Sequence, residues 1–141
     1  MVELKQMQNE LDKIRAIAFK KLAAGNVKDA FSCISEIIST NSYTLDDLYL
    51  AGEWALDSGF YAEAIKLLTR TLSESSIVNE TWYIDSAYIA RAYARVLINE
   101  HALALEDLAQ IKDDVELTWL VNHPPVSKLS LLAQIEGGRA V

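Results

Sequence analysis

The residues that most often carry chemistry are few in this chain, and their spacing matches no known catalytic or metal-binding pattern. His101 and His123 lack the His-Glu-x-x-His spacing of zinc hydrolases, and Cys33 is the single cysteine. The sequence contains neither a glycine-rich phosphate loop nor a Gly-x-Ser-x-Gly nucleophile elbow. We therefore predict a protein that is not an enzyme and that requires no metal and no cofactor.

The remaining reactive groups have both a structural and a functional interpretation. Arg91 and Arg95 are four residues apart, so they share a helix face and could grip a partner's carboxylate together. The structural interpretation, which we favour, is a pair of solvated arginines beside Glu106 or Asp107. Cys33 lies among apolar neighbours, which favours a buried and inert thiol.

Composition and charge limit the function classes. The chain has 141 residues, 51% of them hydrophobic, which is enough for one domain with its own core. The net charge is −7; residues 1–30 carry +2 and the remainder −9. An acidic surface repels phosphate backbones, so we expect no nucleic-acid binding, whereas a basic protein would be attracted. The alternative reading of the acidic charge is solubility alone.

An internal repeat organises the helices. Residues 45–72 read as two helices joined by a tight turn at Ser58-Gly59, with Ala64 early in the second helix. A weaker copy upstream places Gly25 and Ala30 at the matching positions, 34 residues earlier in each case. In a third unit, Ala104 takes the place of Ala64 with a spacing of 40 residues.

These patterns predict a single domain over residues 1–141. Thr44 and Asp47 are spaced to cap the third helix, and Gly52 within it predicts close approach of a neighbouring helix. We expect a polar loop at 73–80, a short helix at 115–122, and a last helix ending at Gly137-Gly138. The expected helix pairs cover about 3–38, 45–72 and 78–112, and a C-terminal cap covers 114–136, with Leu129, Leu132 and Ile135 closing the open end.

The chain resembles the tetratricopeptide-repeat (TPR) family over about residues 11–112. The second unit matches at Gly52, Gly59 and Ala64, although no proline closes the units and the third is offset. The resemblance implies an all-α fold, a TPR-like α-solenoid in which antiparallel helix pairs form a right-handed stack. It also implies a concave groove that binds a protein or peptide. By matching positions, the groove residues are Arg15, Phe19, Tyr49, Glu53, Asp57, Arg91 and Arg95.

We expect a non-catalytic, cytoplasmic protein-interaction module that spans no membrane and masks a basic protein partner, as an immunity or inhibitor protein would. The alternative is a secretion-type chaperone that holds a helical client in its groove. A rival of another class is a small-ligand sensor or enzyme with a pocket beneath the 73–80 loop. Homodimer formation through the amphipathic first helix is a further alternative.

Overall fold

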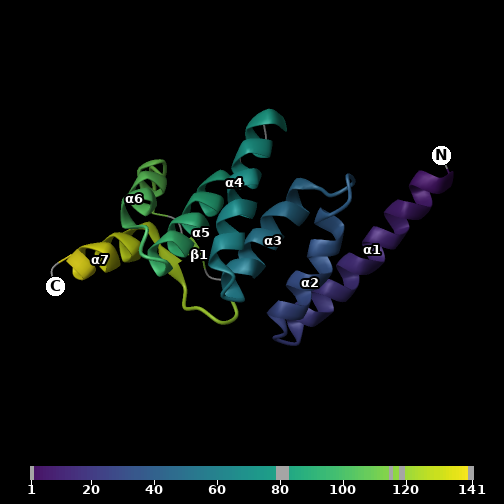
Figure 1. The fold of residues 1–141 in the computed structure, drawn as a ribbon, viewed down its shortest axis with the longest axis horizontal. Coiled ribbons are helices and arrows are strands. Elements are labelled where there is room, and N and C mark those ends of the chain that lie inside the picture. The colour runs from purple at the N-terminus through teal and green to yellow at the C-terminus, as the bar shows by residue number, and fades with distance from the viewer. Residues whose placement is uncertain (1, 79–82, 115, 118–119, 140–141) are drawn as a thin grey trace.

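A computed structural model of the chain describes residues 2–78, 83–114, 116–117 and 120–139. Helices dominate these residues, so the predicted all-α class is confirmed (Figure 1). The helices are α1 (Val2–Ala23), α2 (Val27–Ile38), α3 (Leu45–Asp57), α4 (Tyr61–Val78), α5 (Ile84–Leu97), α6 (His101–Ala109) and α7 (Lys128–Arg139). Two short strands, β1 (Glu116–Leu117) and β2 (Val126–Ser127), precede α7. No described helix is long and apolar enough to cross a membrane.

Helices that follow one another in the sequence also pack against one another in space. From α1 to α6 each helix contacts the next, and α3 also contacts α5. The result is an elongated row of helices with the N-terminus at one end and the C-terminus at the other (Figure 1). Such an arrangement is built mostly from local contacts, which is why the helical periodicity of the sequence already indicates it.

The turns after α1, α3 and α5 share one hydrogen-bonding pattern. The residue in left-handed conformation is Gly25 (φ 83°), Gly59 (φ 87°) or Asn99 (φ 64°). Its amide bonds to the carbonyl three residues back, and the next amide bonds to the carbonyl five residues back. Five residues after each turn residue stands a fully buried alanine: Ala30, Ala64 and Ala104.

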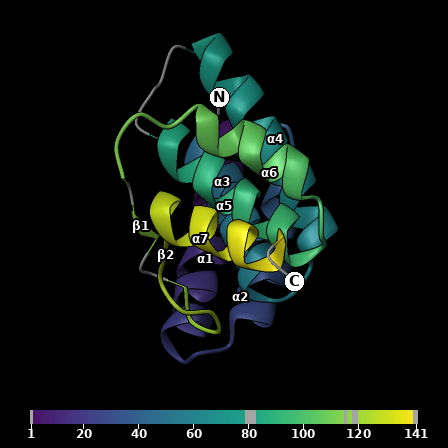
Figure 2. The same cartoon turned by 90° about the vertical axis from the view of Figure 1, so that its left-hand side faces the viewer.

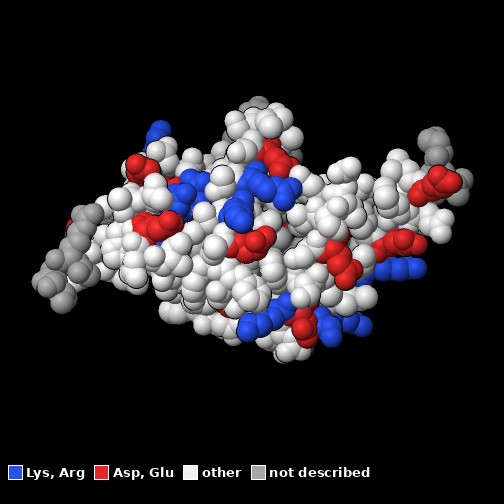
Figure 3. All heavy atoms as spheres, viewed as in Figure 1, with Lys and Arg blue, Asp and Glu red and all other residues white. Residues whose placement is uncertain are grey.

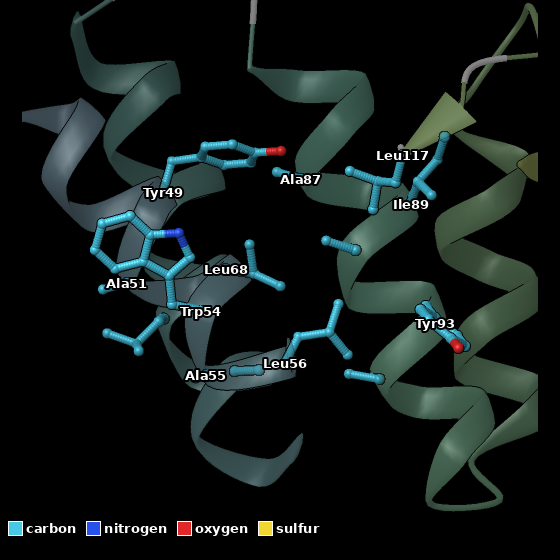
Figure 4. Close-up of a cluster of buried hydrophobic side chains, with 14 of the residues drawn as sticks. Tyr49, Ala51, Trp54, Ala55, Leu56, Leu68, Ala87, Ile89, Tyr93 and Leu117 are labelled. Atoms are coloured by element: carbon cyan, nitrogen blue, oxygen red, sulfur yellow. The ribbon is translucent and has the colours of Figure 1, made fainter. Parts of the chain in front are cut away.

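Gly52 lies where α3 and α4 approach most closely. A Cβ atom at this position would lie 2.8 Å from both Cγ and Cδ2 of Leu68, which is fully buried in α4. The close approach predicted from the glycine is therefore confirmed. Figure 4 shows Leu68 among the aromatic and aliphatic side chains that α3, α4 and α5 contribute to the core.

The polar loop predicted at 73–80 is wrong for the residues that the structure describes. Helix α4 continues to Val78, and residues 79 and 80 lie outside the described part, as does Trp82. The polar side chain of Glu74 has a partner within the fold, because it accepts a hydrogen bond from the Tyr43 hydroxyl at 2.8 Å, and Ser75 is buried in the same stretch of α4. The next helix begins at Ile84 rather than near residue 78.

The C-terminal region differs most from expectation. The short helix predicted at 115–122 is wrong, because β1 pairs antiparallel with β2, with Leu117 opposite Val126. Residues 115, 118 and 119 lie outside the described part. Helix α7 continues through Gly137 and Gly138 to Arg139 instead of ending at the glycines.

Helix α7 closes the C-terminal end of the row. It packs on α5 and α6, and Figure 2 shows it lying at that end beside α6. Leu131 and Ile135 are fully buried, whereas Leu129, predicted to help close the end, is 62% exposed. The register of the buried face therefore differs from the prediction at Leu129.

Candidate functional site

Helix α3 is the element from which most of the site must be built. Its N-terminus is fixed by the predicted capping box: the Asp47 amide donates to the Thr44 hydroxyl (3.2 Å) and the Thr44 amide donates to the Asp47 carboxylate (2.9 Å). The helix carries the buried acidic residues Asp47, Glu53 and Asp57. A buried carboxylate requires a hydrogen-bond donor or a cation next to it, so each of the three identifies a segment that packs on α3.

Arg15 of α1 is the partner of Asp47. Its Nε and Nη2 lie 2.9 and 2.6 Å from the two oxygens of Asp47, and Nη1 lies 2.7 Å from Asp12. Burial alone would raise the pKa of Asp47, but hydrogen bonds from Arg15 and Thr44 outweigh it and leave this pKa lowered. The same carboxylates raise the pKa of Arg15. This two-point ion pair fixes α1 against the start of α3.

A surface pocket of about 320 Å³ lies beside that ion pair. Phe19 is one wall; it is 48% exposed and meets Trp54 edge-on, with 5.6 Å between ring centroids. Asp46 is exposed at the same pocket. The pocket is lined by Arg15, Phe19, Thr44, Asp46, Asp47 and Leu50. The structure thus brings the predicted site residues Arg15 and Phe19 together at one opening.

Tyr49 and Glu53 do not line an open groove, contrary to their predicted place. They are 6% and 1% exposed, and the Tyr49 ring packs on Tyr83 with centroids 5.0 Å apart. Burial, followed by the charge of Glu53, raises the pKa of Tyr49 well above its ordinary value. The prediction assumed that the third unit would leave this face of α3 open, but Tyr83 at the start of α5 covers it.

Asp57 is also buried, because the segment before β2 folds back over the end of α3. Its carboxylate accepts the backbone amides of Val121 (2.6 Å) and Asn122 (2.8 Å) and lies 3.0 Å from Nδ1 of His123. A carboxylate in the last turn of a helix faces the negative end of the helix dipole, so these donors offset an unfavourable position.

His123 is held from several sides. Since a carboxylate only accepts hydrogen bonds, Nδ1 donates to Asp57, and Nε2 lies 3.2 Å from the Tyr61 hydroxyl. The ring also meets Tyr93 edge-on at 5.7 Å. Burial, then the proximity of Tyr61 and Asp57, raises the pKa of Tyr93. We call this set of contacts, made by Asp57, Tyr61, Asn122 and His123, the latch.

Arg91 and Arg95 share one internal partner, Asp107 of α6. Arg91 lies 2.5 Å from Oδ1 through Nη2, and Arg95 lies 2.8 Å from Oδ2 through Nη1. Asp107 is 2% exposed and the two arginine side chains are 14% exposed. Both arginines therefore contact Asp107 within the chain, as the structural interpretation allowed, but they are largely buried rather than solvated.

The side chains at these sites are joined by ion pairs, hydrogen bonds and ring contacts. No group of three or more His, Cys, Asp or Glu residues suited to a metal ion occurs in the described part of the chain. Cys33 is half-buried rather than fully buried. Figure 3 shows acidic and basic side chains interspersed on one face of the molecule, so the acidic excess forms no single large patch there.

Sequence reasoning missed the latch and the hairpin that carries it. The signal available was His123 before Pro124-Pro125, which ends a helix and leaves amides free to bond elsewhere. That signal does not identify Asp57, 66 residues earlier, as the acceptor. Comparison with known families finds no family model that matches the chain, and a search of curated proteins finds no match either.

Proposed function

We propose that this chain is a TPR-like helical-repeat protein that binds another protein without catalysis. Three turns with the same hydrogen-bonding pattern, each followed by a buried alanine at the same distance, support a stack of three helix pairs capped by α7. In such a stack the first helices of the pairs, α1, α3 and α5, would share one face. A right-handed superhelix is part of the proposal.

The observation that carries the binding role is the open pocket between α1 and α3. The chain's own β1–β2 hairpin packs on α5, and Figure 4 shows Leu117 of β1 beside Ile89. The face between α1 and α3 keeps Phe19 half-exposed at a pocket. We therefore confine partner binding to the N-terminal half of the row.

The partner we propose is a basic protein, which this chain would mask as an immunity or inhibitor protein does. The chain carries a net charge of −7, and Asp12 and Asp46 are exposed at or beside the pocket. Charge complementarity of this kind speeds association and weakens with salt.

A second candidate, a chaperone for a helical client, draws on a different observation. Helix α1 exposes Leu4 (57%) and Ile17 (49%) besides Phe19. Apolar burial would then dominate the affinity, and binding would tolerate salt.

The test is capture of partners from lysate of the source cells at about 0.05 M and about 0.5 M NaCl, followed by titration of the purified partner. We expect to capture one basic protein at low salt and to lose it at high salt. The Phe19→Ala variant should bind this protein about tenfold more weakly. Ile77→Ala is the control, since Ile77 is 82% exposed on α4 and lies outside this pocket. An apolar client retained at both salts would replace the masking role with the chaperone. Absence of any purified partner that rebinds would overturn the proposal.

A further inference from the structure

The pocket between α1 and α3 is large enough to accommodate one side chain of a partner. Its volume of about 320 Å³ lies at the lower end of the range for ligand sites, about 300–1,000 Å³. Phe19 and Leu50 supply apolar wall, and the Phe19 ring is half-exposed although it is anchored edge-on by Trp54. A ring that is already held in place loses little conformational entropy when a ligand packs against it.

The charge around this pocket is negative. Among the residues that line it, Asp46 and Asp47 are acidic and Arg15 is basic, and Asp12 pairs with Arg15 beside the pocket. Arg15 is held by Asp47 at two points and by Asp12 at one, so its charge is already matched. Asp46 is exposed and makes no ion pair within the described part of the chain. An incoming cation therefore meets a carboxylate without an ion-pair partner and an aromatic ring in the same pocket.

The start of α3 is the positive end of a helix dipole, which by itself disfavours a cation, and the carboxylates of Asp46 and Asp47 in the first turn offset it. The Asp47 amide is bonded to Thr44, and the Thr44 amide is bonded to Asp47. The capping box thus occupies two of the backbone amides at this helix end.

Resting on the proposed function, we propose that the partner inserts one lysine or arginine side chain into this pocket. Its aliphatic stem lies against Phe19 and Leu50, and its cationic end faces Asp46. Arg15 is a positioning residue, because it fixes the distance between the two helices through Asp47 without offering its own charge to the ligand. This arrangement combines apolar and ionic selection, so it distinguishes a basic side chain from a neutral one of the same shape.

The experiment separates this inference from the partner's existence by using small probes. Amide resonances of the isotope-labelled chain are followed while N-acetylarginine amide is added, with N-acetylcitrulline amide as the neutral isostere. N-acetyllysine amide (acetylated on the α-amino group) and N-acetylnorleucine amide form a second pair. We expect the amides of Phe19, Asp46 and Leu50 to shift with the two cationic probes and not with the neutral ones. Asp46→Asn should weaken the cationic probes about twofold to fivefold, as for an exposed ion pair.

The matched control is Glu36→Gln, which removes the same charge from an exposed position on α2 outside the pocket. It should leave the shifts at Phe19 and Leu50 unchanged. Equal shifts with arginine and citrulline probes, or equal loss with Glu36→Gln and Asp46→Asn, would overturn the inference. If the probes fail while a purified basic partner still binds, the inference falls and the proposed function stands. If the cationic probes bind but no protein partner is found, the inference about the pocket stands and the proposed function is overturned.

Discussion

Two helix glycines provide a sharp test of the packing described above, because the same substitution should have opposite signs. A Cβ at Gly52 would lie 2.8 Å from Cγ and Cδ2 of Leu68, whereas a Cβ at Gly137 in α7 has nothing within 4 Å. Gly52→Ala therefore probes the α3–α4 contact, and Gly137→Ala isolates the intrinsic preference of a helix for alanine.

The magnitudes follow from two opposing contributions. Alanine is favoured over glycine by about 1 kcal/mol in a helix interior. At Gly52, overpacking costs about 1–3 kcal/mol, and the upper half of that range applies because the clash involves the branch point of a fully buried leucine. We expect Gly52→Ala to lower the free energy of unfolding by about 1–2 kcal/mol. Gly137→Ala, near the helix end, should raise it by about 0.5 kcal/mol.

Urea denaturation followed by circular dichroism measures both changes, and Leu68→Ala completes a double-mutant cycle. Removing the Leu68 side chain costs about 2–5 kcal/mol by itself but also removes the clash. In that background Gly52→Ala should therefore become stabilising. A stabilising Gly52→Ala in the otherwise unaltered chain, or an identical effect in both backgrounds, would refute the close approach of α3 and α4.

Two further predictions concern the buried carboxylates. His123→Ala should lower the free energy of unfolding by about 1–3 kcal/mol and speed hydrogen exchange at the Val121 amide, because Asp57 loses a buried donor; unchanged exchange would contradict the latch. The lowered pKa of Asp47 adds stability that is present above its unfolded pKa and lost as pH falls through its lower folded pKa. Urea titrations below about pH 4 should show this loss as a decrease in the free energy of unfolding. The decrease should be smaller in the Arg15→Ala variant, and an equal decrease with and without Arg15 would contradict the ion pair.

Elements that depend on local rules were predictable from the sequence. The helical periodicity, the capping box at Thr44 and the turns at Gly25 and Gly59 involve residues only a few positions apart. Gly52 was also informative, since a glycine that weakens its own helix implies a nearby element. Each of these inferences was confirmed because backbone geometry and short-range hydrogen bonds decide it.

Inferences about exposure failed where distant residues decided it. A helical pattern identifies which residues share a face, but it does not reveal whether another segment covers that face. Glu53 lies within the core, and Asp57 beneath the latch, although both were predicted to face a partner. Helix α4 likewise extends past Leu72, and Glu74 there accepts a hydrogen bond from Tyr43, 31 residues away in the sequence.

The sequence by itself determined where most of the helices lie, the 34-residue spacing of the first two units and the acidic balance of the chain. Those properties depend on local preference and on composition. Only the tertiary structure decided which charged residues are committed to one another and which remain open at Phe19 and Asp46. The physical reason is that desolvation and ion pairing depend on neighbours that chain folding brings from far away, and no local pattern encodes their identity.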